Sequence, residues 1–141
     1  MSNWPKDNGA ELDAFYSRAD GSAKWEINNL VYVPCPWKVY TSWDPAQEYV
    51  KGIRIHKKCA ESFKRVLTDI WETYGKSQDA IKKAGMDRLG GSYFFRPKRG
   101  SRNLSLHAYG AAIDWDPVHN AMTKGNRGDM DPEVINCFLK E

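Results

Sequence analysis

The sequence predicts an α+β fold: a small antiparallel sheet packed on one long helix with several shorter helices, in a single domain spanning residues 1–141. Three observations support this prediction. The length of 141 residues fits one domain and allows about 68–70% of the unfolded chain's surface to be buried. Hydrophobic residues make up 41% of the chain and aromatic residues 13%, which is too much buriable surface for a disordered tail. Gly and Pro interrupt short strand-like and helix-like segments, with no repeat or linker between them.

The first third of the chain predicts one short helix and two extended segments. We expect the helix over residues 11–18. Residues 30–33 (Leu-Val-Tyr-Val) are rich in β-branched and aromatic side chains and predict a strand, which the prolines at positions 34 and 36 stop. A second extended segment is expected over 37–40.

The middle of the chain predicts the main core helix. It is expected to begin between residues 50 and 56 and to end at Gly75. The apolar residues that recur there at mostly three- and four-residue steps are Val50, Ile53, Cys59, Phe63, Val66, Leu67, Ile70, Trp71 and Tyr74. His56, beside two lysines, is expected at the surface of this helix.

The last third predicts two helices and a strand. A short helix is expected over 78–83 and a strand over 92–95, directly before a basic loop. The final helix is expected to begin near Asp131-Pro132 and to run to the last residue, Glu141. Because it has no C-terminal cap, the sequence suggests a longer natural chain.

Composition excludes several classes of protein. No apolar run is long enough to cross a bilayer, and the first residues lack the apolar stretch of a signal peptide. We therefore expect a cytoplasmic chain with no membrane partner. The three cysteines, Cys35, Cys59 and Cys137, have no metal-like spacing and are expected to be free thiols in the core.

The segment 105–116 (Ser-Leu-His-Ala-Tyr-Gly-Ala-Ala-Ile-Asp-Trp-Asp) carries the candidate chemistry. On one flat strand His107 and Asp114 would face opposite sides. Gly110 between them permits a tight bend, so two short extended pieces can bring the imidazole and the carboxylate together. Both groups are zinc ligands, although an ordinary ion pair with a turn-capping aspartate is the alternative for two such residues alone. Ile113 and Trp115 are expected on the face opposite Asp114.

The whole phrase resembles a known signature. The pattern Ser-x-His-x-x-Gly-x-Ala-x-Asp is present as Ser105, His107, Gly110, Ala112 and Asp114. It is similar to that of the zinc D-alanyl-D-alanine carboxypeptidase and dipeptidase family, and most of all to the L-alanyl-D-glutamate endopeptidases of phage endolysins. Flanking residues extend the resemblance: Gly91, Tyr93, Arg96 and Gly100 before the phrase, Asp116, Pro117 and Asn120 after it, and residues 3–5 and 15–16 near the start.

The resemblance implies roles for four residues. His107 and Asp114 would be zinc ligands, Ser105 would neighbour the substrate, and Arg96 would contact the substrate and stabilise the oxyanion. The implied cofactor is zinc, and the implied partner is the peptidoglycan stem peptide, which is the substrate. We expect the enzyme to be a monomer. With no signal peptide, the enzyme would accumulate in the cytoplasm and act on the bacterial cell wall after release.

The sequence departs from the family pattern at its C-terminal end. The family supplies a third zinc ligand, which is a histidine, and a general-base Asp or Glu three residues before it. Neither residue can be placed in this sequence. His119 is a weak candidate for the third ligand. We expect the missing groups beyond Glu141, in a segment that this chain lacks.

Two other functions remain open from the sequence. A catalytically incomplete cell-wall-binding module of the same fold would present Arg96, Arg99 and Ser105 to peptide carboxylates. A nucleic-acid-binding domain is suggested by the basic residues at positions 96, 98, 99 and 102, which follow three aromatic residues. The net charge of only +3 gives little electrostatic drive for nucleic acid.

Overall fold

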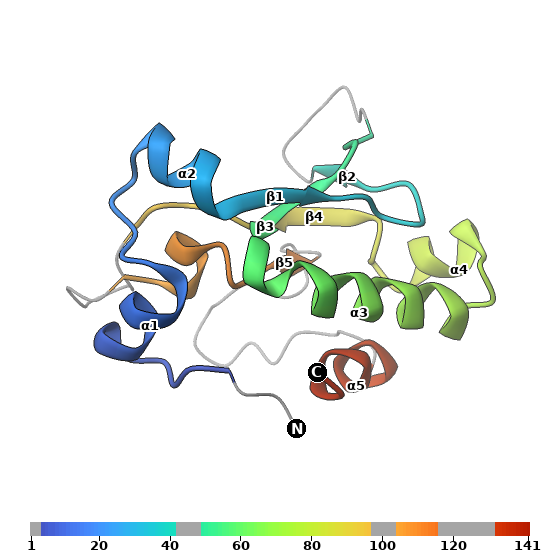
Figure 1. Cartoon of the computed structure of the whole chain (residues 1–141). Coiled ribbons are helices and arrows are strands. Elements are labelled where there is room, and N and C mark those ends of the chain that lie inside the picture. Colours follow the sequence, from blue (N-terminus) through green and yellow to red (C-terminus); the bar gives the residue numbers. More distant parts are fainter. Residues whose placement is uncertain (1–3, 42–48, 97–103, 116–131) are drawn as a thin grey trace, which may run out of the picture.

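The structure is a computed structural model that describes residues 4–41, 49–96, 104–115 and 132–141. Its helices and strands confirm the predicted α+β class (Figure 1). The elements in chain order are α1 (Gly9–Tyr16), α2 (Ala23–Asn29), β1 (Leu30–Val33), β2 (Tyr40–Thr41), β3 (Ile53–His56), α3 (Ala60–Thr73), α4 (Gln78–Lys83), β4 (Arg88–Gly91), β5 (Asp114–Trp115) and α5 (Pro132–Leu139). Two 3₁₀ turns, η1 (Lys57–Cys59) and η2 (Leu106–Tyr109), join them.

The described strands form two small sheets. β1 and β3 pair antiparallel, with Val31 opposite Ile55. In the second sheet β4 lies between β2, which runs parallel to it, and β5, which runs antiparallel. This arrangement places Asp114, the first residue of β5, opposite Gly91 at the end of β4.

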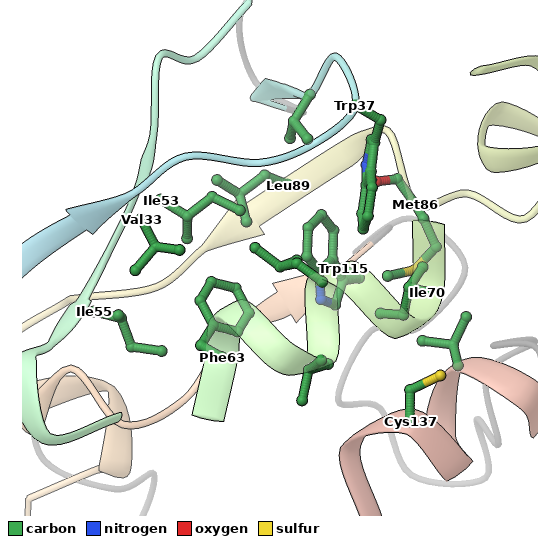
Figure 2. Close-up of a cluster of buried hydrophobic side chains, with 14 of the residues drawn as sticks. Val33, Trp37, Ile53, Ile55, Phe63, Ile70, Met86, Leu89, Trp115 and Cys137 are labelled. Atoms are coloured by element: carbon green, nitrogen blue, oxygen red, sulfur yellow. The ribbon is translucent and has the colours of Figure 1, made fainter. Parts of the chain in front are cut away.

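Helix α3 supplies one wall of the main core. Its buried side chains follow the helical spacing of the sequence and are those of Ala60, Phe63, Val66, Leu67 and Ile70. Figure 2 shows Phe63 and Ile70 facing Trp115 of β5, with Leu89 of β4 on the far side. Burying each of these side chains contributes about 1.5–3 kcal/mol, so β5 is held in the core by Trp115 while Asp114 points away from it.

Several predicted boundaries are confirmed closely. β1 and α4 have the predicted limits, and α5 runs over most of the predicted final helix. α1 lies two residues earlier than expected because Asn8 caps it, with its side chain accepting a hydrogen bond from the Glu11 amide at 3.0 Å. Cys137 is buried in the core, and Cys35 and Cys59 are half-buried against that core. All three are free thiols, as the sequence predicted.

Three predicted elements are wrong in part. The core helix begins at Ala60 rather than between residues 50 and 56, because Ile53–His56 forms β3. There Ile53 and Ile55 are buried through pairing with β1, a contact across more than twenty residues that periodicity does not reveal. The extended segment expected over 37–40 is a strand only at Tyr40–Thr41. The strand expected over 92–95 instead occupies Arg88–Gly91.

His56 is not at the surface as the sequence suggested, since only 1% of it is exposed. Its Nδ1 accepts a hydrogen bond from the Lys58 amide at 3.1 Å, so its Nε2–H donates to the Tyr16 carbonyl at 2.8 Å. Both nitrogens are therefore satisfied in the neutral ring. Burial lowers the pKa of His56, and the charges of Lys57 and Lys58 act in the same direction, against the hydrogen bond to Tyr16.

We expect His56 to make folding pH-dependent. With its pKa lowered in the fold, the unfolded chain binds the proton more readily. The stability contributed by neutral His56 is thus present above the unfolded pKa of about 6.5 and is lost as the pH falls below it. The free energy of unfolding of the wild type minus that of His56→Gln should therefore decrease from pH 7.5 to pH 5, by at most about 1.4 kcal/mol per pH unit. Urea titrations at each pH measure it, and a difference that stays flat contradicts the assignment.

None of the helices in the described ranges is long and apolar enough to cross a membrane.

Candidate metal centre

The turn η2 carries His107, and its two ends are fixed by local chemistry. At the start, the Ser105 hydroxyl accepts a hydrogen bond from the His107 amide at 3.2 Å. At the end, Gly110 adopts a left-handed conformation with φ of 71°, which glycine takes with little steric strain. The bend predicted at Gly110 is thus confirmed, but His107 lies on a 3₁₀ turn rather than on an extended piece.

The bend brings η2 against the first sheet. The Gly110 carbonyl accepts a hydrogen bond from the His56 amide at 2.8 Å. A Cβ at position 110 would lie 2.5 Å from Leu30 Cδ2 and 3.0 Å from the His56 nitrogen. Close packing at this glycine therefore sets the position of the histidine turn relative to β1 and β3.

His107 and Asp114 lie together, as the sequence predicted. His107 Nε2 is 3.4 Å from Asp114 Oδ1. The His107 side chain is 14% exposed and that of Asp114 is 56% exposed. The pair is therefore anchored on the histidine side and open to solvent on the carboxylate side. Trp115 is buried and Ile113 packs half-buried against the core, which confirms the predicted face opposite Asp114.

A backbone hydrogen bond fixes the imidazole. His107 Nδ1 lies 2.8 Å from the Ser92 carbonyl oxygen, which can only accept, so Nδ1 carries the proton. In the neutral ring Nε2 then holds its lone pair toward Asp114. Metal-binding histidines characteristically donate their second ring nitrogen to a carbonyl or carboxylate in this way.

The charges of the site agree with a cation-binding pair. The contact with the Asp114 carboxylate raises the pKa of His107, burial opposes this rise, and the Ser92 hydrogen bond adds to it. The same contact lowers the pKa of Asp114 against the effect of burial. A bare Nε2 facing an ionised carboxylate is unfavourable unless a proton or a metal cation lies between them.

Arg96 is close enough to act on both residues. Its positive charge lowers the pKa of His107 and of Asp114. Its carbonyl accepts a hydrogen bond from the Ser105 amide at 3.0 Å, and its guanidinium lies 5.9 Å from the Phe94 ring centroid. The structure thus brings all four predicted site residues into one neighbourhood.

Ser105 has a local structural role in this neighbourhood. It is only 9% exposed, and its hydroxyl caps η2. We expect Ser105→Ala to lower the free energy of unfolding by about 0.5–2 kcal/mol, the usual effect of losing an N-cap. Ser77→Ala is the control, because the Ser77 hydroxyl also caps a helix, α4, by accepting from the Ala80 amide. If Ser105→Ala left stability unchanged while Ser77→Ala reduced it, the capping role of Ser105 would be wrong.

Within the described residues, the His107–Asp114 pair has no third candidate ligand beside it. No group of three or more His, Cys, Asp or Glu side chains gathers within the described ranges. His119, the weak candidate for the third ligand, lies outside them, as do Asp116, Pro117 and Asn120. The basic side chains at positions 98, 99 and 102, which suggested nucleic acid or peptide carboxylates as partners, also lie outside the described residues.

A cavity of about 580 Å³ lies beside the His107–Asp114 pair, since Leu106, Ile113 and Trp115, their neighbours in the chain, are among its lining residues. The other lining residues come mainly from α1, β3, α3 and α5, and include Leu12, Ile55, Phe63 and Phe138. None of the four predicted site residues is among them. We assign this cavity no part in the chemistry of the pair.

Sequence reasoning missed the groups that hold the site. The Ser92 carbonyl orients His107, and a backbone acceptor leaves no signal in the sequence. Asp13 of α1 accepts a 2.6 Å hydrogen bond from the Tyr109 hydroxyl and so fixes the end of η2. Nothing in the pattern of residues 11–18 distinguishes Asp13 from an exposed helical carboxylate.

Comparison with models of protein families, with curated proteins and with solved structures finds no match to this chain.

Proposed function

We propose that this protein is a zinc-dependent peptidase that hydrolyses a peptide bond in the stem peptide of peptidoglycan. The observation that carries the proposal is the pair of His107 Nε2 and Asp114 Oδ1, which lie 3.4 Å apart. The His107 Nδ1–H donates a hydrogen bond to the Ser92 carbonyl, which leaves Nε2 free to bind a metal. The substrate class comes from the resemblance of segment 105–114 to the zinc peptidoglycan peptidases, and not from the geometry.

The distance between the two ligand atoms suits zinc. Atoms each about 2.0–2.1 Å from a tetrahedral zinc lie about 3.3–3.4 Å from one another. A charge-assisted hydrogen bond between the same groups would be shorter, about 2.7–2.9 Å. The observed 3.4 Å is therefore close to the spacing of two ligands on one metal.

Each residue of the site has a chemical task in this proposal. His107 and Asp114 would hold zinc, which supplies an acidified water and polarises the scissile carbonyl. Arg96 would donate hydrogen bonds to the oxygen that becomes negative in the transition state. Ser105 would hold the turn that carries His107, next to the substrate. The third ligand and the general base are not among the described residues, and His119 is the histidine to test for the ligand.

The place of action follows from the same proposal. We expect a monomer that accumulates in the cytoplasm, with no membrane or nucleic-acid partner, and reaches the bacterial cell wall after release, as endolysins do. Whether the enzyme is a carboxypeptidase or an endopeptidase depends on the shape of the substrate groove rather than on the metal ligands.

The experiment that tests the function is the release of new amino groups from purified peptidoglycan. Release should stop when a chelator removes zinc and return when zinc is restored. We expect Arg96→Ala to keep its zinc and to lower kcat by about 10²–10³. The matched control is Arg65→Ala, because Arg65 lies on α3 and pairs with Glu141. Unchanged turnover in Arg96→Ala, or release that a chelator does not affect, would contradict the proposal.

A cell-wall-binding module without catalysis is the second candidate. It is favoured by the finding that only two metal ligands gather within the described ranges, whereas a catalytic zinc usually has three. Such a module would sediment with cell walls and release no amino groups. Metal-dependent release by the wild type excludes this candidate.

A further inference from the structure

The segment that follows β4 holds His107 at two points. The Ser92 carbonyl accepts from His107 Nδ1 at 2.8 Å, and the Phe94 amide donates to the His107 carbonyl at 3.1 Å. Both contacts come from the backbone of this segment. The orientation of the imidazole therefore depends on where the backbone on either side of Tyr93 is fixed.

The side chain of Tyr93 fixes this backbone. Its ring stacks on Trp25 of α2, with centroids 5.9 Å apart and an interplanar angle of 19°. The guanidinium of Arg54, on β3, lies 4.8 Å from the centroid of the Tyr93 ring. Arg54 is itself held by an ion pair of 2.7 Å with Glu26 of α2. One aromatic ring thus ties the segment to a helix and to a strand of the first sheet.

The ring rather than the hydroxyl makes these contacts. The Tyr93 hydroxyl is buried and has no hydrogen-bond partner among the described residues. A buried hydroxyl without a partner does not stabilise the fold, whereas an aromatic pair and a cation over a ring do. Replacing Tyr93 by phenylalanine should therefore keep both ring contacts, the one with Trp25 and the one with Arg54.

We propose that Tyr93, held between Trp25 and Arg54, is a positioning residue for the metal site and acts through the backbone of Ser92 and Phe94 on His107. The inference rests on the proposed metal site and adds residues that touch no metal or substrate. Its physical basis is that groups which orient a metal ligand tune the metal site, and losing one typically weakens metal binding about 10–100-fold.

The test is a titration of the metal-free full chain with Co²⁺, followed by visible absorption and by competition with a chelator. We expect Tyr93→Ala to bind Co²⁺ about tenfold more weakly and to show a changed absorption spectrum. Tyr93→Phe should match the wild type in both. Ile81→Ala is the control for stability alone, since Ile81 is buried on α4, far from η2 in Figure 1, and should leave Co²⁺ binding unchanged although it destabilises the fold.

The outcomes separate this inference from the proposed function. A wild type that binds no Co²⁺ contradicts the metal site and the inference with it. A wild type that binds, together with a folded Tyr93→Ala of equal affinity and spectrum, overturns the inference alone, as does an equal loss in Ile81→Ala. If Tyr93→Ala does not fold, Arg54→Gln makes the same comparison, because it removes the cation from the ring and leaves Tyr93 in place.

Discussion

Replacing Gly110 with alanine is expected to lower the free energy of unfolding by about 2–5 kcal/mol. The left-handed backbone, with φ of 71°, costs a non-glycine residue about 1–2 kcal/mol. The new Cβ would also meet Leu30 Cδ2 at 2.5 Å and the His56 nitrogen at 3.0 Å, and overpacking of this kind costs typically 1–3 kcal/mol. The His56 nitrogen belongs to the backbone and cannot turn aside, so η2 would have to move.

Gly75→Ala is the matched control for this substitution. Gly75 also has a positive φ, 66°, but a Cβ there would have no neighbour within 4 Å. Its cost should therefore be the backbone penalty of about 1–2 kcal/mol alone. Urea unfolding of both variants measures the difference, which reports the close approach of η2 to β3. Equal losses would show that the approach at Gly110 has no energetic weight.

Removing either proposed metal ligand, His107 or Asp114, is expected to abolish the stabilisation of the fold that added zinc should give. A metal that binds only the folded chain, at a concentration 100 times its Kd, raises the free energy of unfolding by about 2.7 kcal/mol. His107→Ala and Asp114→Ala should lose this increase and should also lose hydrolysis of peptidoglycan. Thermal unfolding with and without zinc measures the effect.

The control for the carboxylate is Asp79→Ala, since Asp79 lies exposed in the first turn of α4. Its response to zinc should equal that of the wild type. A zinc response that survives in both His107→Ala and Asp114→Ala would place the metal elsewhere in the protein.

Elements with strong local signals were predicted well from the sequence. The strand Leu30–Val33 is rich in β-branched and aromatic residues and ends just before a proline. The helix Gln78–Lys83 follows the capping residue Ser77, whose hydroxyl accepts a hydrogen bond from the Ala80 amide. Both sets of boundaries arise from neighbours in the chain. The left-handed Gly110 was predicted for the same reason, because glycine marks such a bend locally.

Elements that depend on distant pairing were not predicted. Ile53–His56 is a strand because β1 pairs with it, and its apolar residues also fit the start of a helical pattern. Arg88–Gly91 ends in two glycines, which have low strand propensity, yet it pairs on both sides with β2 and β5. Tertiary contacts outweighed local preference in both cases.

The candidate site divides in the same way. The residue types of a metal site are visible in the sequence, and the structure brings His107, Asp114, Arg96 and Ser105 together. The group that orients His107 is not visible in the sequence, because it is the backbone carbonyl of Ser92 and any residue type supplies such a carbonyl. The burial of His56 was missed for a related reason, since its partners at Tyr16 and Gly110 come from distant parts of the chain.

The zinc content of the purified chain tests the central claim most directly. Elemental analysis after dialysis should find close to one zinc per chain in the wild type and in His56→Gln, and none in His107→Ala. Such a zinc content requires a third ligand within the chain rather than beyond Glu141, and the same analysis of His119→Ala asks whether that residue is the ligand. Absence of zinc from the wild type, or zinc that remains in His107→Ala, would contradict the site.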